Sequence, residues 1–172
     1  MTRAELDRHL MLAALEEARA AALEDEVPVG AVVAIGSDII AREHNRMRQH
    51  GDPTAHAEVL VIRGALAALQ QRRGGSPDSS GYRGLEQCTL VVSLEPCAMC
   101  AGAIVLSRVD RLVFGAWDDR AGMCGSVGDI VRHHRLNHKP QVQAGTLAAE
   151  SAGLLHDFFA SCRIRGEASD TR

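Results

Sequence analysis

The sequence contains His56-Ala57-Glu58 and, further along, Pro96-Cys97-Ala98-Met99-Cys100, and these two stretches together decide the fold. One histidine and two cysteines make a set of three zinc ligands, which leaves a tetrahedral zinc ion with one open position. That arrangement is typical of catalytic zinc sites, in which the ion lowers the pKa of a bound water molecule. Glu58 lies two residues from His56 and is expected to act as base and proton carrier. The two stretches therefore predict a zinc-dependent hydrolytic site.

The spacing within each stretch also predicts local structure. Cys97 and Cys100 are three residues apart, so on a helix they lie on one face and can bind the same ion. Pro96 stands just before this helix, where its missing N–H costs least, and the helix N-terminus favours thiolates. His56 and Glu58 would point about 200° apart on a regular helix, at about 100° per residue. They converge only if their helix begins at or near His56, and we expect that it does.

The sequence leaves other interpretations of these residues open. A C-x-x-C pair alone is equally typical of a redox pair or of half of a structural zinc knuckle. A four-ligand structural site would need one more ligand, and the chain offers Cys88, Cys124, Cys162 and His138. The combined pattern favours a catalytic zinc, because both stretches fall at strand-to-helix junctions, where the sites of open α/β sheets gather.

The composition is that of an ordinary globular domain: 172 residues, 46% hydrophobic and 24% charged, with a formal net charge of −3. No apolar run is long enough to span a membrane, and the charged N-terminus has no apolar signal core. Five cysteines, two of them in C-x-x-C, argue against a disulfide framework, so we expect a cytoplasmic protein. The net charge excludes only a wholly basic surface. A local patch at residues 132–139 can still bind RNA, although solvated loop charges are its simpler interpretation.

Hydrophobic periodicity divides the chain into alternating helices and strands. The alternation favours one three-layer α/β/α domain over residues 1–165. Residues 72–84, rich in Gly and Ser, are expected to form a flexible surface loop, and residues 166–172 a disordered tail. Helices are predicted at residues 3–24, 55–70, 97–107 and 147–163, and strands at residues 27–35, 39–44, 90–94, 111–115 and 141–144.

Further stretches extend the pattern beyond the zinc ligands. With them, the chain resembles the bacterial tRNA-specific adenosine deaminases, within the zinc-dependent cytidine and deoxycytidylate deaminase superfamily. The stretches around His56 and the cysteines also suit guanine deaminases, whereas Gly125-Ser126, Asn137-His138 and Phe158-Phe159 resemble the tRNA enzymes more specifically. The matching stretches are residues 26–32, 45, 52–58, 94–103, 113–116, 125–126, 136–138 and 157–159.

The resemblance implies a cytidine-deaminase-like fold with a central five-stranded mixed sheet. It also implies a homodimer with the substrate site near the subunit interface, and one Zn²⁺ per subunit bound by His56, Cys97 and Cys100. Glu58 would be the proton shuttle in the hydrolytic deamination of adenosine to inosine in tRNA. The substrate would be the anticodon stem-loop, at its wobble position.

Five more residues receive roles from the same resemblance. Asn45 should hydrogen-bond the target nucleotide and Val29 should line the base pocket, although a turn residue and a core strand position are the plainer interpretations. Asp118, Phe159 and Arg163 match positions near the anticodon stem-loop. Phe159 fits a core position on periodicity alone, and a solvated helix end explains Arg163 nearly as well.

Two other functions fit part of the pattern. A guanine or other free-base or nucleoside deaminase would turn over small bases without an anticodon stem-loop. A non-catalytic, zinc-stabilised RNA-binding module would need a fourth protein ligand, or a Glu58 that does not reach the open position. The only tryptophan, Trp117, departs from the family pattern, and the sequence does not decide between packing at a dimer interface and stacking on a nucleotide.

Overall fold

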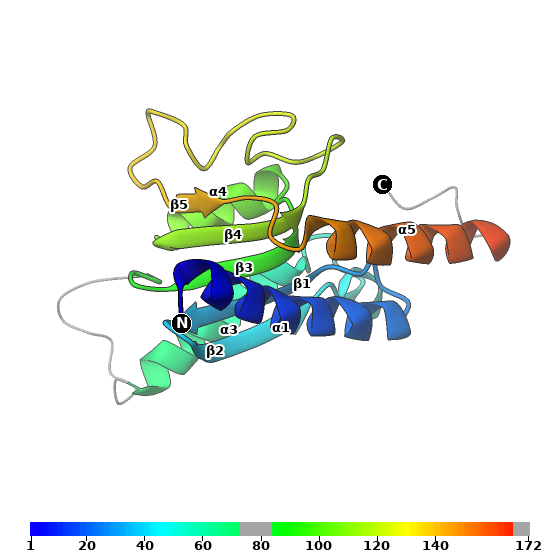
Figure 1. The fold of residues 1–172 in the computed structure, drawn as a ribbon, viewed down its shortest axis with the longest axis horizontal. Coiled ribbons are helices and arrows are strands. Elements are labelled where there is room, and N and C mark those ends of the chain that lie inside the picture. The colour runs from blue at the N-terminus through cyan, green and yellow to red at the C-terminus, as the bar shows by residue number, and fades with distance from the viewer. Residues whose placement is uncertain (73–83, 167–172) are drawn as a thin grey trace.

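A five-stranded mixed sheet forms the centre of this computed structural model, which describes residues 1–72 and 84–166 (Figure 1). The strands are β1 Gly30–Ile35, β2 Asp38–His44, β3 Thr89–Leu94, β4 Arg111–Ala116 and β5 Gln141–Gln143. The helices are α1 Arg3–Leu23, α2 Met47–His50, α3 Ala57–Arg72, α4 Ala98–Leu106 and α5 Ala148–Ile164.

The strand order is β2-β1-β3-β4-β5. β1 is antiparallel to both β2 and β3, whereas β3, β4 and β5 are parallel to one another. It follows that β2 runs in the same direction as β3. The helices α3 and α4, which come after these two strands, therefore start at the same edge of the sheet.

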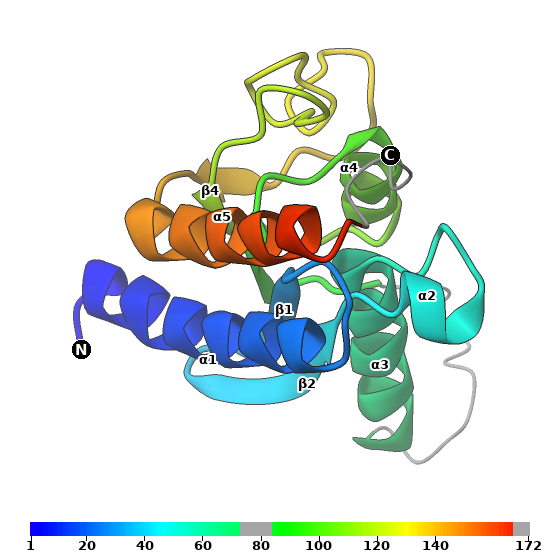
Figure 2. The same ribbon diagram turned by 90° about the vertical axis from the view of Figure 1, so that its right-hand side faces the viewer.

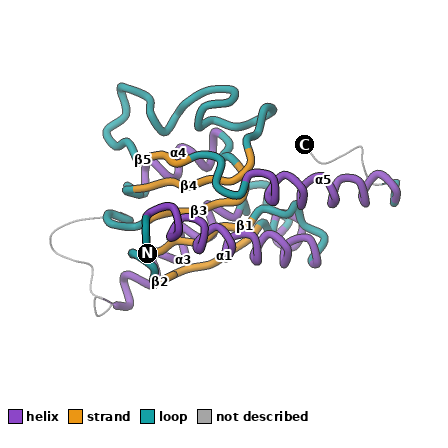
Figure 3. The backbone as a smooth tube through the Cα atoms, in the orientation of Figure 1, coloured by secondary structure: helices purple, strands orange, loops and turns teal. Residues whose placement is uncertain are grey.

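Helices cover both faces of the sheet (Figures 2 and 3). α1 and α5 pack on one face, where Leu15 joins Val32 of β1 in a buried core. α3 and α4 pack on the other face, where Val61 and Ile104 join Val33. Val32 and Val33 are neighbours in one strand and point to opposite faces, as the two-residue period of a strand requires. The cytidine-deaminase-like three-layer α/β/α fold with a five-stranded mixed sheet is thereby confirmed.

Helix α1 is fixed closely to its face of the sheet. A Cβ atom at Gly30 would collide with the backbone oxygen of Ala14, so glycine allows β1 to approach the helix. The Gly30 N–H donates to the Oγ atom of Ser93 at 3.1 Å. Arg111 at the start of β4 forms a buried ion pair with Asp7 of α1, with Nη2 and Oδ2 2.6 Å apart. These contacts leave the face that carries α3 and α4 to build the site.

Three local features test the element predictions. β1 begins at residue 30, not at 27, because Val29 donates to the Val27 oxygen at 2.7 Å in a tight turn and Pro28 has no N–H for a neighbouring strand. The short helix α2 has no counterpart among the predicted elements. The helix predicted at residues 55–70 begins at Ala57, immediately after His56, and this confirms the start that the motif requires.

The predicted loop at residues 72–84 and the predicted tail at residues 166–172 fall almost wholly outside the described residues. Arg72 ends α3 and donates to the Oδ2 atom of Asp38 at 3.0 Å, while Gly84 and Gly166 lie in turns. Within the described residues, 1–72 and 84–166, no helix is both long and apolar enough to cross a membrane.

Candidate metal and catalytic site

Three potential metal ligands meet where α3 and α4 begin. His56 immediately precedes α3, Cys97 is the N-cap residue of α4, and Cys100 lies in the first turn of that helix. Pro96 precedes the N-cap residue, so its lack of an N–H group removes no hydrogen bond from the helix. The strand directions bring both helix starts to one edge of the sheet, so the ligands meet although the sequence separates them.

The ligand atoms are spaced as a zinc ion requires. The Nδ1 atom of His56 lies 3.7 Å from the Sγ atom of Cys97 and 3.5 Å from that of Cys100. Zn–S bonds of about 2.3 Å and Zn–N bonds of about 2.0–2.1 Å, at a tetrahedral angle, place two such ligand atoms about 3.6 Å apart. All three ligand atoms lie within 4.8 Å of one another. The donor types and their spacing therefore fit Zn²⁺.

No fourth His, Cys, Asp or Glu joins this group within residues 1–72 and 84–166. The other candidates from the sequence have different surroundings. The thiol of Cys124 faces the carbonyl oxygen of Pro96, and Cys88 precedes β3 at its amino end. The Nε2 atom of His138 lies 2.6 Å from a backbone carbonyl oxygen, and Cys162 is in α5. A three-ligand set is typical of catalytic zinc sites rather than structural ones.

Hydrogen bonds within the ligand group shift its pKa values in different directions. A hydrogen bond from Cys100 lowers the pKa of Cys97 to about 4, although burial acts the other way. The same bond raises the pKa of Cys100, and burial adds to the effect. The hydrogen bond with Cys97 raises the pKa of His56. The surroundings therefore favour a thiolate at Cys97, which is the form that binds a metal.

Glu58 lies beside the ligand group without belonging to it. Its side chain is in the first turn of α3 and only 4% of it is exposed. Burial raises the pKa of Glu58 above its ordinary value, and the neighbouring His56 acts in the opposite direction. The nearby Glu58 side chain also raises the pKa of Cys100. A carboxyl group in this place can hold a proton next to the metal ligands.

Asn45 and Val29 are hydrogen-bonded to each other near the start of α3. The Oδ1 atom of Asn45 accepts a hydrogen bond from the Ala57 N–H at 2.9 Å, at the start of α3. The backbone N–H of Asn45 donates to the oxygen of Val29 at 3.1 Å. Asn45 is thus buried between the end of β2 and the start of α3, and Val29 adjoins it. Asn45 therefore has a structural role at the start of α3.

Glu95 is a functional candidate that the sequence interpretation missed. Only 2% of this residue is exposed, at the end of β3 and one residue before Pro96. Its carboxylate accepts hydrogen bonds from the backbone N–H groups of Asp118, Cys124 and Ser126, each at 3.0 Å. The Ser126 hydroxyl also donates to it. Burial raises the pKa of Glu95, but these hydrogen bonds outweigh it and lower the pKa below its usual value.

The segment around Glu95 is the loop that follows β4, residues 117–126, called here the 117–126 loop. The loop returns to the metal site, because Gly122 forms an antiparallel bridge with Cys97. A Cβ atom at Gly122 would collide with the Glu95 carboxylate, so the loop closes tightly around that side chain. An acidic residue between an apolar strand and Pro96 is the one signal in the sequence for this role.

The three predicted RNA-contact residues lie in two places. Asp118 is in the 117–126 loop, where its Oδ1 atom accepts from the Arg120 N–H at 3.0 Å. Phe159 and Arg163 are in the C-terminal half of α5, which extends past the end of β4 (Figure 1). Phe159 is 38% exposed, whereas its neighbour Phe158 is buried against it with ring centroids 5.5 Å apart. The pair thus has one core residue and one surface residue.

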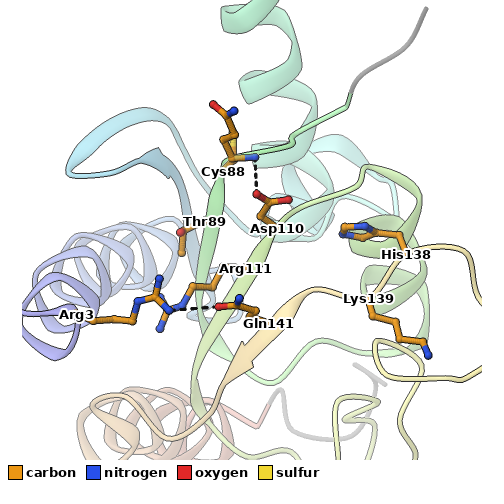
Figure 4. A pocket seen from close by; sticks show the side chains of 9 residues that line it. Arg3, Cys88, Thr89, Asp110, Arg111, His138, Lys139 and Gln141 are labelled. Atoms are coloured by element: carbon orange, nitrogen blue, oxygen red, sulfur yellow. Dashed lines mark hydrogen bonds between the residues drawn. The ribbon is translucent and has the colours of Figure 1, made fainter.

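A cavity of about 430 Å³ lies at the opposite edge of the sheet (Figure 4). Its lining includes Thr89, Arg111 and Gln141, which are the first residues of β3, β4 and β5. The cysteines follow the last residue of β3, so six residues of strand separate the cavity from the metal ligands. The candidate active site is therefore identified by the group of metal ligands and not by the size of a cavity.

Comparison with known proteins bears on this arrangement. Residues 4–116 match the family model described as "Cytidine and deoxycytidylate deaminase zinc-binding region". The chain is 43% identical over 163 residues to the tRNA-specific adenosine deaminase of Bacillus subtilis (strain 168), covering 95% of this chain and 94% of that protein.

Solved structures show the same likeness. A structure from studies of A-to-I editing by tRNA:A34 deaminases at the wobble position of transfer RNA is 42% identical, with a TM-score of 0.75, and the match covers 86% of this chain and 99% of that one. A guanine deaminase from Nitrosomonas europaea is 30% identical, with a TM-score of 0.70 over 87% of this chain and 82% of that one.

Replacing Glu95 should destabilise the 117–126 loop. Glu95→Ala leaves buried N–H donors without an acceptor, and one such donor costs about 1–3 kcal/mol, so we expect a loss of about 3–5 kcal/mol in urea unfolding. The matched control is the exposed Glu16→Ala, for which we expect a change within about 0.5 kcal/mol. Hydrogen exchange should quicken at the amides of Asp118, Cys124 and Ser126. Equal unfolding free energies for the two variants would contradict the assignment.

Proposed function

The chain belongs to the cytidine and deoxycytidylate deaminase zinc-binding family and, within it, to the tRNA-specific adenosine deaminases, and we propose that it converts the wobble adenosine of a tRNA anticodon to inosine. One observation carries this proposal. Three ligand atoms spaced for zinc lie beside a buried carboxyl group that is not one of them. That combination suits hydrolysis, because the metal and the proton carrier are separate groups.

In this proposal His56, Cys97 and Cys100 would hold the zinc ion, which when bound would lower the pKa of a water molecule to near neutrality. The Glu58 carboxylate would accept a proton from the attacking water molecule. The pKa of Glu58 is raised by burial, so the residue retains the proton until the N1 atom of adenine accepts it.

Overall, a carbon–oxygen bond forms at C6 of the base and the bond from C6 to the amino nitrogen breaks. Glu58 then takes the proton that remains on the oxygen added at C6 and passes it to the departing amino group, which leaves as ammonia. Adenosine and water thus give inosine and ammonia. A Glu58 carboxylate that bound the metal would occupy the open position that the water molecule needs.

The reacting carbon of adenine cannot be reached while the base is stacked in a helix. An anticodon loop presents its bases largely unpaired, which suits a site at the edge of a sheet. The identities of 43% and 42% to tRNA enzymes, against 30% to a guanine deaminase, support RNA-borne adenosine over a free base. The three-ligand set within the described ranges argues against a purely structural zinc module.

Incubation with defined substrates tests this function. The zinc-loaded protein should form inosine and ammonia from an anticodon stem-loop RNA with adenosine at the wobble position. Free guanine should yield neither xanthine nor ammonia at a comparable rate. The matched control is Glu58→Gln, which should keep its zinc by metal analysis and lose about 10²- to 10⁴-fold in turnover. Turnover of guanine alone, or full activity of the control, would sink the proposal.

Asn45 and Val29 form the proposed nucleotide contact. Because the Oδ1 atom of Asn45 accepts from Ala57, the Nδ2 group is the part of this side chain that donates to the substrate. Val29 is buried beside it and presents an apolar wall. The same asparagine therefore fixes the start of α3 and binds the nucleotide.

The substitution Asn45→Asp separates these two roles. A carboxylate oxygen still accepts from the Ala57 N–H and suits a helix N-terminus, so the fold and zinc content should persist. The lost Nδ2 donor should lower kcat/KM for the stem-loop RNA roughly 10- to 100-fold. The matched control is Gln70→Glu, the same change from amide to carboxylate at an exposed position near the end of α3, which should leave kcat/KM unchanged. An Asn45→Asp enzyme with normal kcat/KM would remove Asn45 from substrate binding.

We also propose a homodimer formed through the outer faces of α3 and α4. A shallow apolar hollow of about 250 Å³ lies there, lined by Val59, Ile62 and Leu66 of α3 and by Ala103 and Leu106 of α4. Leu106 is 76% exposed in a single chain. Burial of such a patch against a second copy removes apolar surface from water next to the helix starts that carry the site.

A charge in this patch should separate the subunits. Leu106→Glu should shift the sedimentation coefficient from dimer to monomer at micromolar protein, because the carboxylate would be buried without a partner. Leu23→Glu is the matched control, since Leu23 is 90% exposed at the end of α1 and distant in sequence from the patch. Dimers of unchanged stability in Leu106→Glu would place the interface elsewhere.

The remaining tRNA contacts are proposed on exposure and position. Phe159 and Arg163 lie on the projecting half of α5, and Asp118 lies in the 117–126 loop beside Cys97. A cytoplasmic location suits a tRNA substrate, and all five cysteines are free thiols, as in reducing compartments.

A further inference from the structure

Trp117 is the only tryptophan of the chain and follows directly after β4. The pairing of Leu94 with Ala116 places it level with Glu95, at the edge of the sheet where the metal ligands lie. Its ring meets the ring of Phe114 edge to face, with centroids 4.9 Å apart and an interplanar angle of 86°. Phe114 belongs to the core beneath α3 and α4, so the indole is on the face of the sheet that carries the site.

The indole is held in place while half of it stays exposed. Trp117 is 50% exposed. The N–H of the next residue, Asp118, is fixed by Glu95. Gly125 lies against the ring, since a Cβ atom there would come within 3.1 Å of it. A fixed aromatic ring loses little conformational freedom when a ligand stacks on it.

A guanidinium group lies next to the indole. A Cβ atom at Gly125 would lie 3.4 Å from the Nη2 atom of Arg132 and 3.1 Å from the indole, so the two side chains flank the same glycine. Arg132 is itself fixed, because Nη2 donates to the Cys124 oxygen at 2.9 Å and Nε to Asp129 at 2.7 Å. An aromatic surface beside a fixed cation suits a base together with its phosphate.

We propose that Trp117 is a stacking surface for the base next to the reacting adenosine in the RNA substrate. The inference rests on the proposed function, because it needs an RNA substrate. Removing the target base from the stack leaves its neighbour with one uncovered face, and the indole covers that face. A second copy of this chain is the less favoured occupant, since the apolar hollow on α3 and α4 does not include Trp117.

The single tryptophan makes direct observation possible. The probe is the anticodon stem-loop RNA, added to zinc-loaded Glu58→Gln protein so that binding proceeds without turnover. Stacking should quench the indole fluorescence in a saturable way, with the same midpoint as the anisotropy change of labelled RNA. Binding by anisotropy with no change in indole fluorescence would overturn the proposal.

Kinetics of the active enzyme give a second measure. Trp117→Ala should raise KM for the stem-loop about 10- to 100-fold, whereas kcat should change less than about twofold, since stacking acts on binding. Trp117→Phe should recover part of the loss. Val127→Ala is the matched control, because Val127 is 58% exposed in the same region and has no ring. Equal KM values for Trp117→Ala and wild type would refute the stacking role.

Abasic substitutions identify the stacked base. An abasic site at the stacked position should abolish the quenching of the indole. With that RNA, wild type and Trp117→Ala should have the same KM. Abasic sites at other loop positions should have neither effect. Dissociation of the protein into monomers by Trp117→Ala, without any effect of RNA on fluorescence, would instead assign the indole to a subunit interface and overturn the proposal. Failure of the proposed function is distinct, because wild type would then form no inosine from any stem-loop.

Discussion

The site depends on one constraint. The Nδ1 atom of His56, just before α3, must lie within about 4 Å of the Sγ atoms of Cys97 and Cys100 at the start of α4. The common direction of β2 and β3 brings the two helix starts to one edge. Local hydrogen bonds then set the fine position. The Asn45 amide fixes the first turn of α3, and Glu95 fixes the 117–126 loop that pairs with Cys97.

Two buried glutamates show how the surroundings divide one side-chain type into two roles. Glu58 is 4% exposed and Glu95 is 2% exposed, so burial opposes ionisation in both. Around Glu95, backbone N–H groups and the Ser126 hydroxyl outweigh burial and hold the carboxylate charged. Around Glu58, burial prevails and the pKa rises. A Glu95 carboxylate with a lowered pKa is suited to fixing a loop, whereas Glu58 is suited to taking up and releasing protons.

The sequence interpretation located the ligand group because its signals are local. The C-x-x-C spacing and the required helix start at His56 depend on neighbouring residues, and the structure has both features. Glu95 was missed because its partners lie 23 to 31 residues further along, in a loop without periodicity. The predicted start of β1 was wrong because Pro28 and a tight turn interrupt the first residues of an apolar run, and the strand forms only after them. Hydrophobic pattern does not record such long-range hydrogen bonds.

Substrate choice cannot reside in the ligand group alone. The guanine deaminase relative shares the fold at 30% identity, and the sequence around His56 and the cysteines suits both substrate classes. Discrimination must therefore come from groups outside the ligand group, and under the proposed function the candidates are the 117–126 loop and the C-terminal half of α5. The buried Glu95 carboxylate couples these surroundings to the chemistry, because the loop that carries Asp118 and Trp117 is folded around a residue two positions from a metal ligand. The hydrogen bonds of Glu95 therefore fix the 117–126 loop and the start of α4 relative to each other.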